Sequence, residues 1–259
     1  MLTNIAAYHF AAIEDPGTLA GHIRDWAEAG ALRGTVLVAP EGVNIFLAGA
    51  DDAIETFLGQ LRAVPALTGL QAKYSHSALQ PFGRLKVKVK REIIAFRKGA
   101  EADPLQGRAP AVAPADLARW IEQGADDNGR PVVLLDTRNR EEVDHGTFAG
   151  ALTLPIDNFT ELPDALAPHR PALEDATVVG FCTGGIRCEK AVLWMRAQGM
   201  DNVLQLDGGI LGYFEHVGGL GYEGECFVFD DRVALDPALR PRVEGDVHAD
   251  PPAVSPWRT

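Results

Sequence analysis

The stretch Cys182-Thr-Gly-Gly-Ile-Arg-Cys188 decides how this chain folds and what chemistry it supports. It follows an apolar run at residues 177–181, typical of a short buried strand, and precedes a helical pattern at residues 189–195. A cysteine at such a turn faces backbone N–H groups and the positive end of a helix, which favour the thiolate and lower the pKa. Because Gly184 and Gly185 lack side chains, those amides can converge on an anion. We therefore interpret Cys182 as a nucleophile in an anion-binding loop rather than as a structural cysteine at a helix start.

The spacing inside this loop indicates which anion chemistry it suits. Four residues separate Cys182 from Arg187, so the loop has six residues and resembles the active-site loop of rhodanese domains, which carry sulfur as a cysteine persulfide. The related phosphatase loop is one residue longer, so phosphate-monoester hydrolysis is disfavoured. Two further segments, around Asp136-Thr-Arg138 with Glu142 and at residues 207–212, also resemble rhodanese motifs. The resemblance implies a rhodanese-type α/β domain with a mostly parallel sheet.

Several residues around the loop have open roles. We expect Thr183, Gly184, Gly185, Ile186 and Arg187 to form the active-site loop, with Arg187 supporting it from inside. Asp136 and Arg138 either buttress the loop through a charge-assisted hydrogen bond or form a surface ion pair of little energetic value.

The other two cysteines also lie within or after this domain. Cys188 either resolves an oxidised or persulfidated Cys182 by disulfide exchange or is a small buried hydrophobe on the helix. Cys226 has no visible partner in the sequence, and we interpret it as structural.

The N-terminal part has a different pattern of elements. Strand-like alternation at residues 4–11 is followed by a helix introduced by Pro16, then by a hairpin with its turn at residues 40–42. Asp51 or Asp52 is expected to cap a second helix, and a last strand is expected at about residues 85–96. The order β-α-β-β-α-β predicts a ferredoxin-like α+β domain.

These patterns divide the chain into four parts. We predict a ferredoxin-like, acylphosphatase-like domain at 1–98, a linker rich in Gly, Pro and Ala at 99–113, and a rhodanese domain at 114–220. A C-terminal extension covers 221–259, and its many prolines and few large apolar residues predict disorder after about residue 236.

The longer string Cys-Thr-Gly-Gly-Ile-Arg-Cys-Glu-Lys-Ala at residues 182–191 narrows the resemblance. It resembles the rhodanese-domain tRNA uridine(34) hydroxylases, as do two N-terminal segments: Glu41-Gly-Val-Asn44, and Phe82-Gly-Arg84 through Ile93. The family hydroxylates the wobble uridine of tRNA with molecular oxygen. The resemblance therefore implies that this chain forms 5-hydroxyuridine at position 34, uses oxygen as co-substrate, binds the tRNA anticodon arm and carries Cys182 at its active site.

A basic strand in the first domain is compatible with an RNA partner, and the family resemblance favours that interpretation. Lysines alternate with apolar residues, so the lysines project from one face of the strand while the apolar side chains pack inward. Such a row can follow phosphates, but it can equally be a solvated strand face or a protected sheet edge. The candidate RNA-binding residues are Arg84, Lys86, Lys88, Lys90 and Arg91.

Composition limits the remaining function classes. The net charge is −12, but residues 1–98 contain 11 Lys/Arg and 9 Asp/Glu, whereas residues 99–220 contain 9 and 19, so basic charge is concentrated in the first domain. An odd count of three cysteines fits a reducing cytoplasm. No apolar run approaches membrane-spanning length, and no signal peptide, metal site or organic cofactor site is evident.

Two other functions remain open from the sequence. The loop is equally compatible with a sulfurtransferase of the thiosulfate type that works through a Cys182 persulfide, although a basic N-terminal domain is unnecessary for a small sulfur donor. A non-catalytic RNA-binding or scaffolding protein is disfavoured by the intact cysteine and glycine loop. Nucleoside analysis of tRNA from a strain lacking the protein discriminates the three functions. Loss of hydroxylated uridine indicates a hydroxylase, loss of thiolated nucleosides indicates a sulfurtransferase, and no change indicates a non-catalytic protein.

Overall fold

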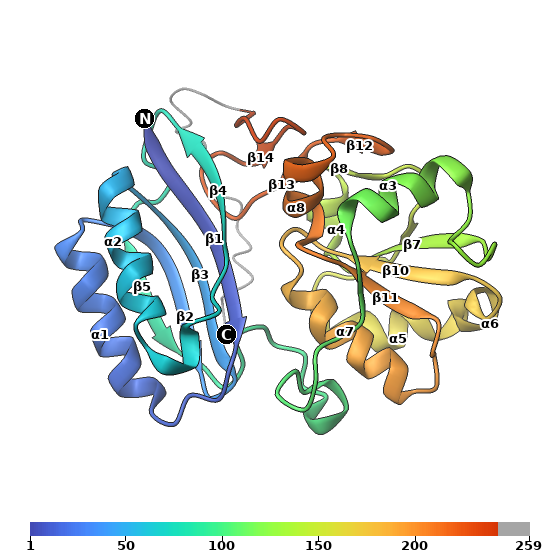
Figure 1. The fold of residues 1–259 in the computed structure, drawn as a ribbon, viewed down its shortest axis with the longest axis horizontal. Coiled ribbons are helices and arrows are strands. Elements are labelled where there is room, and N and C mark those ends of the chain that lie inside the picture. The colour runs from blue at the N-terminus through green and yellow to red at the C-terminus, as the bar shows by residue number, and fades with distance from the viewer. Residues whose placement is uncertain (243–259) are drawn as a thin grey trace. The chain divides into compact units, whose positions relative to one another are not determined.

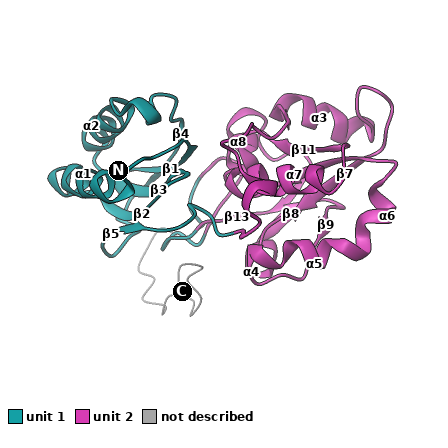
Figure 2. Cartoon of the chain, turned by 90° about the horizontal axis from the view of Figure 1, so that it is seen from below, with its two compact units in different colours: residues 1–95, 229–233, 240–259 teal, residues 96–228, 234–239 magenta. Residues whose placement is uncertain are grey.

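A computed structural model describes residues 1–242, which fall into two compact units (Figure 2). Unit 1 contains residues 1–95, 229–233 and the described residues from 240 onward, and unit 2 contains residues 96–228 and 234–239. The chain therefore returns to unit 1 after it has completed most of unit 2. The disorder expected after about residue 236 concerns mainly residues 243–259, which lie outside the described residues.

Unit 1 is a sheet with helices on one face (Figure 1). Within the described residues, its five strands have the order β4-β1-β3-β2-β5. All neighbours are antiparallel except β2 and β5, which are parallel. The elements are β1 (Leu2–Phe10), α1 (Pro16–Ala29), β2 (Arg33–Ala39), β3 (Gly42–Gly49), α2 (Asp51–Arg62), β4 (Ala72–Ser77) and β5 (Leu85–Val89), with a short 3-10 turn at Pro65–Leu67.

The core of unit 1 lies between this sheet and its two helices. Every third or fourth residue of α1 is apolar, so Leu19, Ile23 and Ala27 are buried on one face. They pack with alternate strand residues such as Val36 and Ile45, both 0% exposed. The apolar side chains that alternate along the strands therefore pack against the apolar face of α1 in one layer.

Two expectations about unit 1 are wrong in detail. The strand predicted as the last of four is the fifth, β5, which pairs with β2 at one edge of the sheet. The strand that was not predicted, β4, pairs with β1 at the other edge and completes the ferredoxin-like order. The segment Ala72-Lys-Tyr-Ser-His-Ser77 carries few apolar residues, so its alternation gave no strand signal. Asp51 and Asp52 do not cap α2 but begin it after Ala50, and Asp51 instead accepts a hydrogen bond of 2.9 Å from Thr3 Oγ1.

Unit 2 is a parallel sheet with helices on both faces. The strand order is β6-β11-β10-β7-β9 within the described residues, with every neighbouring pair parallel. Figure 1 shows α3 and α8 on one side of this sheet and α5 and α7 on the other. The elements are β6 (Ala111–Val112), α3 (Pro114–Gln123), β7 (Val132–Asp136), α4 (Arg140–Val143), β8 (Gly146–Phe148), β9 (Leu152–Thr153), α5 (Leu162–Leu166), α6 (Arg170–Leu173), β10 (Thr177–Phe181), α7 (Ile186–Ala197), β11 (Val203–Leu206), α8 (Gly209–His216), β12 (Tyr222–Gly224), β13 (Cys226–Phe227) and β14 (Ala234–Leu235), with 3-10 turns at Gly99–Ala102, Phe159–Glu161 and Ala167–His169.

Residues 99–113, which the sequence suggests as a linker, contribute to unit 2. Arg108 and the backbone N–H of Ala109 both donate to the fully buried carboxylate of Glu189 on α7, at 2.7 and 2.9 Å. Val112 in β6 pairs with Leu206 in β11. These contacts attach the segment to α7 and to the sheet of unit 2. Over residues 1–242, none of the helices has the length and apolarity required to cross a membrane.

Candidate active site at the Cys182 loop

The Cys182 loop begins where β10 ends and closes where α7 starts. Beside it, β7 ends in the same register, because Phe181 pairs with Asp136 and the N–H of Thr137 donates to the Phe181 carbonyl at 3.0 Å. Parallel strands place their carboxyl ends at one edge of a sheet, where α/β proteins bind ligands. The two motifs at residues 136–138 and 182–187 are therefore neighbours at this edge.

The loop backbone stabilises a negative charge on Cys182. Gly185 adopts a φ of +101°, which favours glycine, and its N–H donates to the Cys182 sulfur at 3.1 Å. Burial alone would raise the pKa of Cys182. The thiol of Cys188, the charge of Arg187 and the backbone N–H groups of both residues outweigh burial and lower the pKa to about 5. At neutral pH the sulfur is a thiolate, which agrees with the environment expected from the sequence.

The glycine-rich segment at residues 207–212 holds the loop from the other side. The first backbone N–H groups of α8 donate to loop carbonyls, from Ile210 to Cys182 at 2.9 Å and from Leu211 to Thr183 at 3.0 Å. Gly209 has a φ of +63°, and a Cβ there would lie 2.5 Å from the Cys182 carbonyl oxygen. A side chain at this position would therefore displace the loop.

Glu142 links the loop to α4, a role that the sequence did not reveal. Its carboxylate accepts from both terminal nitrogens of Arg187 at 2.5 and 2.6 Å, and from the Thr183 hydroxyl at 3.3 Å. Burial would raise the pKa of Glu142, but the Arg187 charge lowers it, so the group is ionised. The sequence places Glu142 inside the rhodanese-like motif, which marks it as a candidate site residue. Its partner Arg187 lies 45 residues away, so the ion pair itself could not be predicted.

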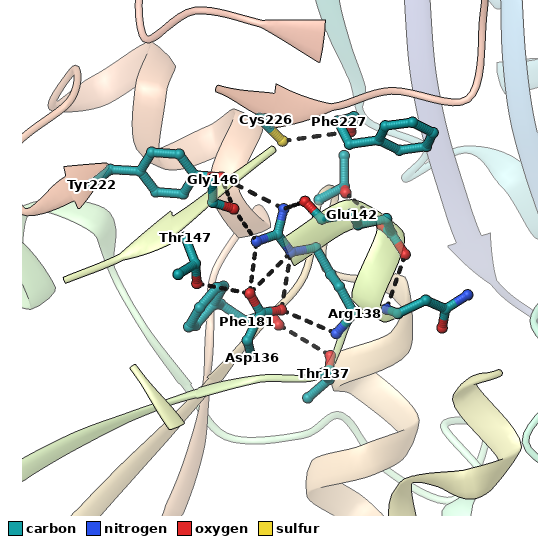
Figure 3. A network of polar contacts seen from close by, with 12 residues as sticks. Asp136, Thr137, Arg138, Glu142, Gly146, Thr147, Phe181, Tyr222, Cys226 and Phe227 are labelled. Carbon is teal, nitrogen blue, oxygen red and sulfur yellow. Dashed lines mark hydrogen bonds and ion pairs between the residues drawn. The ribbon is translucent and has the colours of Figure 1, made fainter. Parts of the chain in front are cut away.

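Asp136 and Arg138 form a buried pair beside the loop rather than a surface pair (Figure 3). Both side chains are 0% exposed, and Arg138 bonds Asp136 through Nε at 2.9 Å and through a terminal nitrogen at 2.6 Å. The same guanidinium donates to the Gly146 carbonyl at 2.6 Å, and Thr147 Oγ1 donates to Asp136 at 2.8 Å. The Tyr222 hydroxyl also donates to the Gly146 carbonyl, so the pair connects β7, β8 and β12.

The two remaining cysteines both lie close to the loop. Cys188 is in the first turn of α7, is 0% exposed, and has its sulfur 3.3 Å from Thr137 Oγ1. Its pKa is raised by burial and by the neighbouring Cys182. Cys226 is also buried, contacts the Thr183 hydroxyl and the Phe227 carbonyl, and has a pKa raised to about 12 by burial. Cys226 is thus a neutral thiol packed against the loop.

The basic row lies in unit 1 on β5. Lys86 and Lys88 are exposed, while Leu85 and Val87 pack against the core below the helices, so the lysines lie on the sheet face turned away from α1 and α2. Arg84 and Arg91 are exposed at the two ends of the row, and Lys90 is half-buried.

The N-terminal motif around Glu41 is held to the end of this segment. Glu41 accepts from the Ile93 N–H at 2.7 Å, and the Asn44 side chain donates to the Ile93 carbonyl at 3.2 Å. The side chains of Glu41 and Asn44 therefore bind both backbone polar groups of Ile93, which belongs to the segment at residues 82–93. The sequence gives no indication of this contact, because the partners are about fifty residues apart.

Residues that commonly hold metals do not gather in the part of the chain that the structure describes. Within residues 1–242, no group of three or more His, Cys, Asp or Glu side chains is arranged to hold a metal ion. The polar groups around Cys182 are hydrogen-bonded to one another instead, as the Glu142 and Asp136 contacts illustrate.

Two family models match this chain, one within each unit. The family model described as "UPF0176 acylphosphatase like domain" matches residues 2–93, and the rhodanese-like domain model matches residues 113–216. Among solved structures, the human single-domain sulfurtransferase is 29% identical and covers 42% of this chain and 97% of its own, with a TM-score of 0.34. The rhodanese-like domain from Anabaena is 23% identical, over 44% and 79% of the two chains, with a TM-score of 0.35.

Curated relatives extend over almost the whole chain. The protein named tRNA uridine(34) hydroxylase from Xanthomonas campestris pv. campestris strain 8004 is 66% identical, over 96% of this chain and 98% of its own. The protein of the same name from Xylella fastidiosa strain 9a5c is 61% identical, over 93% of both chains. With an acylphosphatase-like unit, a rhodanese unit and this identity throughout, the chain belongs to the family of tRNA uridine(34) hydroxylases.

Proposed function

We propose that this chain hydroxylates the C5 position of uridine 34 in tRNA, with molecular oxygen as co-substrate. The observation that carries this proposal is an identity of 61–66% over at least 93% of the chain to proteins named tRNA uridine(34) hydroxylase. A tRNA substrate is in keeping with a row of exposed lysines in an otherwise acidic protein. As a tRNA-modifying enzyme, it would act in the cytoplasm.

Cys182 is the catalytic residue of this proposal. Its sulfur is a thiolate at neutral pH, and the backbone N–H groups of Gly185 and Arg187 and the Arg187 guanidinium favour that charge. Glu142 positions Arg187, and the Asp136–Arg138 pair positions the end of β7 beside the loop. These residues are positioning residues, because they act through Cys182 and its loop.

Access to Cys182 requires local movement. The side chain is 0% exposed, so a uridine base reaches its sulfur only after side chains around the loop move. The base itself must leave the stack of the anticodon loop, since reactive atoms inside a stack are hard to reach. Oxygen is much smaller than a base and needs less opening.

The anticodon arm would be held through its phosphates. Lys86 and Lys88 in β5, with Arg84, Lys90 and Arg91 beside its two ends, form a basic row, and the exposed members can contact a phosphate backbone without reading bases. Contacts of this kind release counterions, so the binding should weaken as salt rises. The selection of uridine at position 34 would then take place at the Cys182 loop rather than at the basic row.

The test is oxygen-dependent modification by the purified chain. Unmodified tRNA is incubated with the protein under air, under argon and under isotope-labelled oxygen gas, and the anticodon fragment is analysed by nucleoside mass spectrometry. We expect 5-hydroxyuridine at position 34 under air, none under argon, and incorporation of the label under labelled oxygen. A thiolated uridine formed from an added sulfur donor, with no hydroxylation, would contradict the proposal and indicate a sulfurtransferase.

A further inference from the structure

Two cysteines flank the active loop, Cys182 at its start and Cys188 directly after its last residue. The loop turns at Gly185, whose N–H donates to the Cys182 sulfur at 3.1 Å, and Cys188 follows in the first turn of α7, close enough for each cysteine to shift the pKa of the other. Thr137 Oγ1 lies 3.0 Å from the Phe181 carbonyl and 3.3 Å from the Cys188 sulfur, which fixes Cys188 toward the end of β10. A disulfide between them requires the two sulfurs to approach to a bond length of about 2.05 Å, which a local movement of the loop would supply.

The two sulfurs also differ in protonation. The pKa of Cys182 is lowered to about 5, whereas burial and the Cys182 charge raise the pKa of Cys188. At neutral pH the pair is therefore one thiolate and one thiol, which together hold one transferable proton and two transferable electrons. Both residues are 0% exposed, so in the structure neither sulfur meets an oxidant or reductant from solvent without local movement.

Hydroxylation by oxygen has an unmet requirement for electrons. Reduction of O2 to one hydroxyl group and one water takes four electrons, and oxidation of the uridine C5–H bond supplies two. We propose that the Cys182–Cys188 dithiol supplies the other two electrons and closes to a disulfide in each turnover. This inference rests on the proposed function, since it concerns the same reaction at the same loop.

The atoms and charges balance without another cofactor. The Cys182 thiolate, the Cys188 thiol, one proton, O2 and the C5–H of uridine give the C5–OH, one water and the Cys182–Cys188 disulfide. One oxygen atom enters the base and the other leaves as water, whose hydrogens come from Cys188 and from solvent. A dithiol reductant of small-molecule or protein type then regenerates the pair by thiol–disulfide exchange.

Cys226 is not suited to this role. Its sulfur contacts the Thr183 hydroxyl and, at 3.7 Å, the Phe227 carbonyl. Burial raises its pKa to about 12, so it stays a thiol at neutral pH. Cys226→Ala is therefore a control that removes one of the three cysteines and leaves the proposed pair in place.

The experiment counts product and disulfide in one sample. The full chain is reduced, freed of reductant under argon and mixed with excess unmodified tRNA before air is admitted. Acid-quenched samples are alkylated and analysed for 5-hydroxyuridine and for a peptide linking Cys182 to Cys188. We expect about one product per chain with one such disulfide, and repeated turnover only when dithiothreitol is present. The Cys226→Ala variant should give the same ratio.

The variant Cys188→Ser separates electron supply from folding. It should give at least tenfold less product than the wild type in the absence of reductant, while its unfolding midpoint stays close to that of the wild type. Product formed while both thiols remain free, or normal product from Cys188→Ser without reductant, would overturn the dithiol role and leave the hydroxylase function intact. No 5-hydroxyuridine in any sample, with dithiothreitol included, would overturn the proposed function and the dithiol role with it.

Discussion

Glu142 and Arg187 form a bidentate ion pair that joins α4 to the loop around Cys182. The two nitrogen–oxygen distances are 2.5 and 2.6 Å, and the side chains are 1% and 7% exposed. A charge pair removed from water is stable only when both partners are present, because either one alone would be a buried unpaired charge. The pair therefore ties the conformation of the loop to the packing of unit 2.

Breaking this pair should cost stability as well as loop geometry. Glu142→Gln removes the negative charge and leaves Arg187 buried, so we expect the free energy of unfolding to fall by about 3–5 kcal/mol. Denaturant unfolding measures the loss. The matched control is Asp157→Asn, which makes the same chemical change in an exposed pair with Arg140 and should hardly move the midpoint. Equal effects of the two variants would contradict this account of Glu142.

The thiolate of Cys182 should appear at unusually low pH. With a pKa of about 5 instead of 9.0, the sulfur is protonated below pH 5 and charged above it. Ultraviolet titration of thiolate absorbance, with Cys182→Ser subtracted, should show one step near pH 5. In Arg187→Gln the midpoint should rise, because a positive charge is lost and the Glu142 carboxylate is left unneutralised. A wild-type midpoint near pH 9 would contradict the loop electrostatics.

Gly209 should be far less tolerant of substitution than Gly184. In Gly209→Ala the new Cβ meets the Cys182 carbonyl at 2.5 Å and the Gly185 nitrogen at 2.7 Å, and φ is +63°. Strain of this kind costs about 1–3 kcal/mol before any displacement of the loop. Gly184→Ala has open space and serves as the control for stability. If Gly209→Ala unfolds at the same denaturant concentration as Gly184→Ala, the packing of α8 on the loop is not as described.

The basic row on β5 should determine how tRNA binding depends on salt. Lys86→Gln with Lys88→Gln removes two exposed charges, so tRNA affinity should fall and the slope of log affinity against log salt should decrease by about 1–2. A filter-binding or fluorescence titration at several salt concentrations gives this slope. The control, Arg119→Gln with Arg196→Gln, removes two charges from α3 and α7 and should leave the slope unchanged. If both double variants lower the slope equally, net charge rather than the row governs binding.

The parts of the structure that the sequence predicted are those with local signals. The turn from β10 to α7 was predicted because its strand, glycines and helix are contiguous, and the hairpin of β2 and β3 for the same reason. The edge strand β4 was missed because only Ala72 and Tyr74 supply apolar side chains to it, which is too short an alternation to indicate a strand. It pairs with β1 through backbone hydrogen bonds, which its side chains do not indicate.

The contacts that were missed join residues far apart along the chain. Glu142 meets Arg187 across 45 residues, and Glu41 meets the Ile93 backbone across 52. A single sequence contains no measure of such proximity, so a buried carboxylate partner cannot be distinguished from a surface one. The choice between a buried and an exposed Asp136–Arg138 pair stayed open until the structure placed both side chains out of contact with solvent.

Hydroxylation of uridine 34 should require Cys182, and nucleoside analysis of cellular tRNA measures this requirement at the position where the product forms. A strain lacking this protein is complemented with the wild type or with Cys182→Ser at matched expression, and position 34 is analysed by mass spectrometry. We expect the wild type to restore 5-hydroxyuridine and its derivatives and Cys182→Ser to restore none. Full restoration by Cys182→Ser would show that Cys182 is not required for hydroxylation.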